Sequence, residues 1–383
     1  MNDSNQQAPI DVTPWLNALY ERGGSDLFVT ADAPPLLKVN GRLYPLTKYA
    51  LTPAQSQDAV MSVMNDRQRA SFEETHECNF ALGMGDKIRF RVSAFYQRHH
   101  VGMVCRLVQT QIPTFEEMDL PSDILAQLAS SKRGIILLVG GTGSGKSTTL
   151  AAMLGHRNRN ASGHIVTIED PIEFVHRHAK SLITQREVGN DTESFEVGLR
   201  NTLRQAPDVI MIGEVRTREA MEHALTFAET GHLVLATLHA NNANQTMDRI
   251  LHFFPEEQRE QVLLDLSFNL RATIAQQLLP AINRERRHVS LEILVNSPLI
   301  QEKIRKGEIQ DIKAIMKDSQ QHGMMTFDQS LVRMYEDGKI SYDDAIRHAD
   351  SANEVRLAVK LSSGGDAKSL ANQLETSGLQ GTE

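Results

Sequence analysis

The sequence of 383 residues has only two cysteines, Cys78 and Cys105. Two thiols without a C-x-x-C pair exclude a disulfide framework and a cysteine-based zinc site, and they fit a reducing compartment. Long apolar runs are also missing, since runs such as residues 135–139 fall far short of the ~20 residues of a membrane helix. Residues 1–11 are polar and carry no signal pattern. We therefore expect a cytoplasmic protein with no integral membrane segment.

An excess of positive charge is absent as well. The chain has 40 Lys and Arg against 48 Asp and Glu, a formal charge of -8. A protein that coats nucleic acid needs a basic surface, and a translocase needs a basic channel segment with interleaved aromatics. Neither is found, so we expect no nucleic-acid partner. The length predicts two domains, and 40% hydrophobic with 23% charged residues is typical of a globular protein.

A glycine-rich loop is the strongest motif that is present. It follows an apolar run at residues 134–139 and leads into a helical segment at residues 149–154. Backbone N–H groups of such a loop, with the positive end of the following helix, cradle the phosphates of a nucleotide. Lys146 is predicted to reach the phosphates and the Ser147 hydroxyl to reach Mg²⁺. The predicted ATP-binding residues are Gly141, Thr142, Gly143, Ser144, Gly145, Lys146, Ser147 and Thr148.

Residues 12–110, before this loop, read as a mixed α/β unit without nucleotide motifs. Asn40-Gly41 predicts a hairpin turn, and Thr52 with Gln55 predicts a capping box that opens a helix. Residues 87–108 alternate like paired strands. We place a linker at residues 111–121 and expect residues 1–11 to be disordered.

Short apolar runs after the loop alternate with helical stretches. The runs at residues 165–168, 209–212 and 233–238 predict buried parallel strands with crossover helices. From residue 255 onward the pattern predicts a mainly helical chain, with amphipathic helices over 256–273 and 341–349. The second domain is expected to span residues 122–361, and the polar tail 362–383 to be disordered.

Acidic residues follow two of these strands. Glu214 ends the run at 209–212, where a carboxylate can hold Mg²⁺ through water; a surface acid is the alternative. Glu173 lies in an acidic turn that Pro171 forces at the carboxyl end of the sheet. Two interpretations of this turn are open. Its acids bind metal and water, with one glutamate as general base, or they form a solvated acidic turn.

Histidines and arginines add further candidates. His232 and His239 bracket the run at 233–238, about 23 Å apart on opposite faces, so they do not share a metal. His239 can sense the γ-phosphate, or it can be structural. Residues 87–115 contain no acid, so their arginines are either a solvated basic strand or a set offered to a neighbouring subunit's nucleotide. These arginines are Arg89, Arg91, Arg98 and Arg106.

Four segments in this order resemble the boxes of the secretion-type ATPases. Residues 140–148 match Walker A, 167–174 the Asp box, 212–216 Walker B, and 229–239 the His box. The resemblance covers residues 20–350. It is strongest to the type IV pilus retraction ATPases, the PilT/PilU family, and within that family to the PilU branch.

The resemblance implies an α/β chain with a PAS-like α+β domain and a RecA-like P-loop ATPase domain, assembled as a homohexameric ring. Glu173 would be the catalytic glutamate and Glu214 the Walker B acid. His232 and His239 would form the His-box pair. The residues implied to meet the nucleotide across the subunit boundary are Arg89, Arg91, Arg98 and Arg106.

The implied activity is ATP hydrolysis that drives pilus retraction and twitching motility at an inner-membrane platform protein. Gly141 stands where PilT-like loops have proline, and Thr217 where they have aspartate, which favours a PilU-type accessory that acts with a PilT-like ATPase. An ATP-binding scaffold with little turnover is the alternative. An assembly or type II secretion ATPase is disfavoured, because that group carries a tetracysteine insertion and no cysteine follows Cys105.

Overall fold

The computed structural model describes residues 10–85, 88–108 and 110–362. Contacts divide these residues into two compact units. The first holds the residues up to Gln111 together with the short segment Ile172–His176, and the second holds the remainder. The expected disorder at residues 1–11 and 362–383 falls almost entirely outside the described residues. Within the described part of the chain, no helix is long and apolar enough to cross a membrane.

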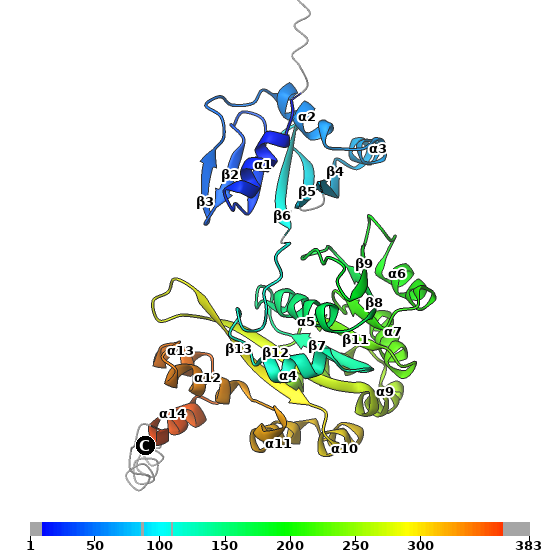
Figure 1. Cartoon of the computed structure of the whole chain (residues 1–383), viewed down its shortest axis with the longest axis vertical. Helices are drawn as coiled ribbons and strands as arrows, with labels where there is room; N and C mark the ends of the chain where they lie inside the picture. The colour runs from blue at the N-terminus through cyan, green and yellow to red at the C-terminus, as the bar shows by residue number, and fades with distance from the viewer. Residues whose placement is uncertain (1–9, 86–87, 109, 363–383) are drawn as a thin grey trace, which may run out of the picture. The chain divides into compact units, whose positions relative to one another are not determined.

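The first unit is built on an antiparallel sheet with the strand order β3-β2-β1-β6-β5-β4 (Figure 1). The predicted hairpin at Asn40-Gly41 is confirmed, because both residues have positive φ and join β2 to β3. The strands are β1 (Asp26–Val29), β2 (Leu36–Val39), β3 (Arg42–Pro45), β4 (Glu77–Met84), β5 (Ile88–Gln97) and β6 (His100–Val108).

One face of this sheet packs on helices. Phe90, Val92 and Ala94 alternate along β5 and are buried in a core with residues of the helices, so the intervening residues of β5 point to the opposite face. The capping box predicted at Thr52 and Gln55 is confirmed at the start of the second helix. The helices are α1 (Thr13–Glu21), α2 (Pro53–Ser62) and α3 (Asp66–Thr75).

The second unit holds a seven-stranded sheet with the order β13-β12-β7-β11-β10-β8-β9. All neighbouring strands are parallel except β13, which runs antiparallel to β12. The three strands predicted at 165–168, 209–212 and 233–238 are confirmed. The bounds are β7 (Gly134–Val139), β8 (Gly163–Glu169), β9 (Ser181–Glu187), β10 (Val209–Ile212), β11 (Leu233–Leu238), β12 (Leu270–Pro280) and β13 (Arg287–Val295).

Helices cover both faces of this sheet. Along β7, Ile135, Leu137 and Val139 enter one apolar core while Ile136 and Leu138 enter another, as expected for a strand buried on both sides. The helices are α4 (Ser122–Ala129), α5 (Lys146–Asn160), α6 (Phe195–Thr202), η1 (Leu203–Gln205), α7 (Arg218–Glu229), α8 (Ala243–His252), α9 (Glu256–Asn269), α10 (Pro298–Lys306), η2 (Ile309–Asp311), α11 (Ile312–Asp318), η3 (Gln320–His322), α12 (Phe327–Glu336), α13 (Tyr342–Arg347) and α14 (Ala352–Ser362).

The prediction of a mainly helical chain after residue 255 is wrong for residues 270–295. The helix expected over 256–273 ends at Asn269, and the chain then forms the long β12–β13 hairpin (Figure 1). Leu, Ala and Gln dominate residues 270–279, and these residue types favour a helix locally. The open edge of β7 overrides that preference by pairing with β12.

A buried carboxylate lies on this hairpin. Glu292 of β13 is 2% exposed, and its Oε1 accepts a hydrogen bond of 2.8 Å from the Ala243 backbone N–H at the start of α8. Burial raises the pKa of Glu292 to about 7, and Asp350 nearby adds to that effect while Lys313 opposes it. The proton is therefore held more tightly in the folded chain than in the unfolded one.

We expect stability to depend on pH through Glu292. A carboxyl whose pKa is raised from 4.5 to about 7 stabilises the fold at low pH, and this contribution of about 3 kcal/mol is lost as pH rises from about 4.5 to 7. Glu292→Gln keeps an oxygen that accepts from Ala243 but does not ionise. The Tm of the variant minus the Tm of the wild type, measured at pH 5 and at pH 8, should be several degrees larger at pH 8. A difference that does not change with pH contradicts this account.

Candidate active site

The glycine loop joins β7 to α5 in the second unit. Gly145 precedes the first residue of the helix, Lys146, and has a φ of 90°, a left-handed conformation that favours glycine. Gly143 also has positive φ, at 77°. The predicted order of strand, loop and helix is therefore confirmed, and the first N–H groups of α5 point into the loop without partners from the helix itself.

Space for a phosphate chain exists at this loop. A Cβ added to Gly141 or Gly143 would meet no atom within 4 Å. A cavity of about 450 Å³ adjoins the loop and is bounded on its other side by Gln277, Arg287 and other residues. An open glycine cradle at a helix N-terminus suits a nucleotide polyphosphate.

Lys146 lies across the loop. Its Nζ donates hydrogen bonds to the carbonyl oxygens of Gly140 at 2.8 Å and Gly141 at 2.9 Å. Burial lowers the pKa of the Lys146 ammonium, and the charge of Glu214 acts in the opposite direction. The loop carbonyls thus hold a partly buried cation beside the cradle, where it can transfer its hydrogen bonds to phosphate oxygens.

Glu214 is positioned by the strands on both sides of β10. The Gly213 N–H donates to Ile168 O of β8 at 2.8 Å, and the Val215 N–H donates to Thr237 O of β11 at 2.8 Å. Thr237 returns a bond of 2.6 Å from its hydroxyl to Gly213 O. These bonds fix the backbone on each side of Glu214 at the carboxyl edge of the sheet, where the sequence places it. Its role as the metal-side acid stays a prediction.

Both carboxylate oxygens of Glu214 have cationic or histidine partners. His239 Nε2 lies 2.7 Å from Oε1, and Arg216 contacts Oε2 through Nε at 2.6 Å and Nη2 at 2.5 Å. The bond to Glu214 raises the pKa of Arg216. The structure therefore brings Glu214 and His239 together, and it adds Arg216, whose pairing sequence spacing did not predict.

His232 lies at the opposite end of β11 from His239. Its Nδ1 lies 3.0 Å from Phe227 O and 3.1 Å from Thr230 Oγ1, both at the end of α7. These contacts anchor the turn between α7 and β11. A catalytic role for His232 stays a prediction, and its contacts in this chain are structural.

Glu173 belongs to the segment that packs with the first unit. Its Oε1 lies 3.2 Å from Nη2 of Arg91 on β5. Glu173 and Glu214 thus fall in different compact units, and the partner of Arg91 comes from its own chain. The predicted catalytic role of Glu173 stays a prediction.

The other predicted arginines lie on the same hairpin of the first unit. Arg91 and Arg106 are directly opposite on β5 and β6, so with Arg89 they share the face that does not enter the helix-covered core. Arg106 Nε lies 2.7 Å from the carboxylate of the buried Asp26, which gives it a structural partner. Arg98 is exposed at the hairpin turn with a φ of 48°.

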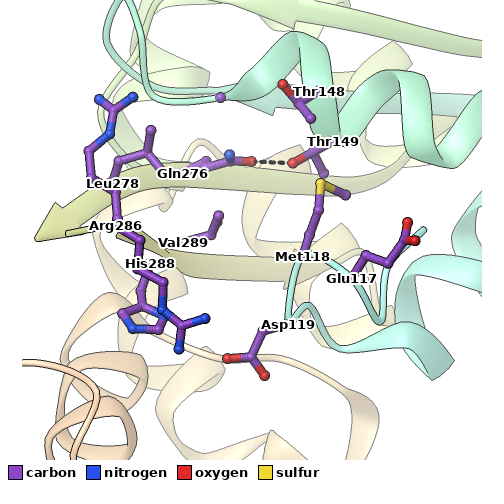
Figure 2. Close-up of a pocket in the computed structure, with 12 residues that line it drawn as sticks. Glu117, Met118, Asp119, Thr148, Thr149, Gln276, Leu278, Arg286, His288 and Val289 are labelled. Carbon is purple, nitrogen blue, oxygen red and sulfur yellow. Dashed lines mark hydrogen bonds between the residues drawn. The ribbon is translucent and has the colours of Figure 1, made fainter. Parts of the chain in front are cut away.

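A second cavity, of about 300 Å³, opens where α5 begins (Figure 2). Thr148 and Thr149 line it from α5, Leu278 from β12, and His288 from β13, while Glu117 approaches from the segment before α4. Burial lowers the pKa of His288, with the charge of Arg286 acting in the same direction. The glycine-loop motif marks Gly145 and Thr148 of this lining, whereas no motif marks the residues from β12 and β13, which lie in the hairpin predicted to be helical.

Comparisons with known proteins identify the family of this chain. A model of the family described as Type II/IV secretion system protein matches residues 4–347. The chain belongs to that family. It is 57% identical over 368 residues to the Type IV pilus ATPase PilU of Pseudomonas aeruginosa, covering 96% of each chain. It is 39% identical over 336 residues to the PilT of the same organism, covering 88% of this chain and 97% of the relative.

A solved structure extends the likeness to three dimensions. The crystal structure of the pilus retraction motor PilT with bound ADP matches with a TM-score of 0.84 and 41% identity, covering 90% of this chain and 98% of that one. The resemblance to the PilT/PilU group is confirmed, with greater identity to PilU than to PilT. The protein is a type IV pilus ATPase, an α/β chain with a RecA-like unit.

We expect Glu214→Gln to lower kcat for ATP hydrolysis by about a hundredfold or more, because the variant removes the charge that His239 and Arg216 hold in place. Steady-state phosphate release measures the effect. The matched control is Glu222→Gln, which breaks the exposed pair between Glu222 and Arg218 on α7. Equal losses in the two variants would contradict the assignment of Glu214.

Proposed function

We propose that this ATPase promotes type IV pilus retraction as an accessory motor that acts with a PilT-like ATPase. The observation that carries the proposal is the 57% identity to PilU over nearly the whole chain, against 39% to PilT. Gly141 and Thr217, which depart from the PilT pattern, support the same branch.

The arrangement of the site favours an enzyme that hydrolyses ATP over a scaffold that binds ATP with little hydrolysis. A scaffold needs only the phosphate cradle and Lys146. Here Glu214 is also held between His239 and Arg216, an arrangement that phosphate binding alone does not require. Glu173 supplies a second acid, for which we propose the role of general base toward the attacking water.

Mg²⁺ is part of the proposal. Among the described residues, no group of three or more His, Cys, Asp and Glu side chains forms a metal site. Mg²⁺ in ATPases does not need one, because phosphate oxygens, waters, a loop hydroxyl and one carboxylate supply its ligands. Ser147 is exposed at the start of α5 and fits the hydroxyl, and Glu214 fits the carboxylate acting through water.

We propose that the nucleoside of ATP occupies the cavity of Figure 2. The cavity begins at Gly145 and Thr148, where the phosphate chain would leave the loop. Leu278 and Val289 provide an apolar wall for a base, and the carboxylate of Glu117 can accept from ribose hydroxyls.

The working form is proposed to be a homohexameric ring on the cytoplasmic side of the inner membrane, at the pilus platform protein. In such a ring Arg89, Arg91, Arg98 and Arg106 would approach a neighbour's nucleotide. Arg98 supports this best, because it is exposed at a turn, whereas Arg106 is paired to Asp26. The absence of cysteine after Cys105 argues against an assembly or type II secretion ATPase.

A retraction assay in cells tests the proposal. Four strains are compared. They carry this protein alone, the PilT-like partner alone, both proteins, or the partner together with the Lys146→Ala variant of this protein. We expect twitching zones and retraction force to need the partner and to fall when this chain is absent or carries Lys146→Ala, because the variant removes the phosphate-binding cation.

The matched control is Lys317→Ala, which removes an exposed lysine of α11 that pairs with Glu354. If Lys146→Ala supports retraction as well as the wild type does, the scaffold alternative replaces the motor. Full retraction with this protein alone would contradict the accessory role.

A further inference from the structure

Gln276 of β12 lies directly beneath the glycine loop. Its side chain is buried, with 2% of the residue exposed. The amide Nε2 donates to Ser144 O at 2.7 Å. Its Oε1 accepts from the Thr149 hydroxyl at 2.8 Å, the bond drawn in Figure 2. One amide therefore joins the last part of the loop to the first turn of α5.

Two glycines of the loop, Gly140 and Gly145, pack closely against Gln276. A Cβ on Gly140 would lie 2.4 Å from the Gln276 carbonyl oxygen, and a Cβ on Gly145 would lie 2.7 Å from Nε2. A Cβ on Gly140 would collide with the backbone of β12, and a Cβ on Gly145 would displace the Gln276 amide. Gly141 and Gly143, by contrast, have open space around them. The loop thus has a closed side, packed against Gln276, and an open side that faces the cradle.

The bond to Ser144 O sets the direction of a phosphate-binding group. Ser144 C=O and Gly145 N–H belong to the same planar trans peptide, in which the two groups point in opposite directions. Holding the carbonyl oxygen against β12 turns the Gly145 N–H away from Gln276, toward the open side of the loop. Thr149 fixes the amide orientation, because its hydroxyl donates to Oε1 and leaves Nε2 for the carbonyl.

We propose that Gln276 is a positioning residue for ATP, which aims the Gly145 N–H at the phosphates by clamping the Ser144 carbonyl to β12. It touches the loop and not the reacting atoms. The inference rests on ATP binding at the glycine loop, and it does not depend on the role of the protein in retraction.

The first test is Gln276→Met in the full-length protein, which preserves much of the volume and removes both hydrogen bonds. A misdirected N–H weakens binding of the ground state and the transition state alike. We expect KM for ATP and Kd for a fluorescent mant-ADP probe to rise about tenfold, with kcat changed less than threefold. ATPase rates and fluorescence titration measure the two quantities.

Asn296→Leu is the matched control for a loss of stability. Asn296 is a half-buried amide that likewise makes two bonds, from Nδ2 to Ser267 O and Leu270 O, away from the loop. Its loss should lower Tm without changing KM or the mant-ADP Kd. If Gln276→Met lowers Tm as Asn296→Leu does and leaves both nucleotide constants unchanged, the positioning role is overturned.

A double-mutant cycle with Thr149→Val separates the clamp from a general packing effect. Thr149→Val removes the bond to Oε1 but leaves the bond to Ser144 O possible, so its effect on KM should be smaller than that of Gln276→Met. In the Gln276→Met background it should add almost nothing. Fully additive effects contradict the clamp. The mant-ADP titration tests the inference even where hydrolysis is too slow to measure, and so separates its failure from a failure of the motor role.

Discussion

The parallel pairing of β7, β11, β10 and β8 is the constraint on which the nucleotide unit depends. In a parallel sheet the carboxyl ends of the strands meet at one edge. The glycine loop after β7, His239 after β11 and Glu214 after β10 are therefore brought to that edge by backbone hydrogen bonding alone. The side chains then adjust to one another locally, with Glu214 taking both His239 and Arg216 as partners.

The β12–β13 hairpin completes this edge. β12 extends the sheet beside β7, which places Gln276 under the loop and Leu278 in the wall of the second cavity. β13 carries Glu292, which binds the first N–H of α8, the helix that follows His239 by a few residues. The hairpin thus holds the phosphate loop through Gln276 and the helix after His239 through Glu292. Without the hairpin, both segments would lose these hydrogen bonds.

Residues 270–295 were mispredicted for a physical reason. Leu, Ala and Gln favour a helix when only local preference is counted, and no glycine or proline separates them from α9. What decides their conformation is the unpaired edge of β7, which lies some 130 residues away in the sequence. Arg216 was missed for a related reason, because a pair of residues two apart in a loop after a strand has no spacing that predicts contact.

Sequence by itself determined the motif-bearing parts of this protein. The strand, glycine loop and helix, the strands at 165–168, 209–212 and 233–238, the Asn40-Gly41 turn and the family resemblance all rest on local patterns that only a few backbone conformations satisfy. Tertiary structure alone decided which side chains from distant segments meet: Gln276 with Ser144 and Thr149, Glu214 with His239, and Glu173 with Arg91. Such pairs depend on strand order and register, which a sequence of local patterns does not encode.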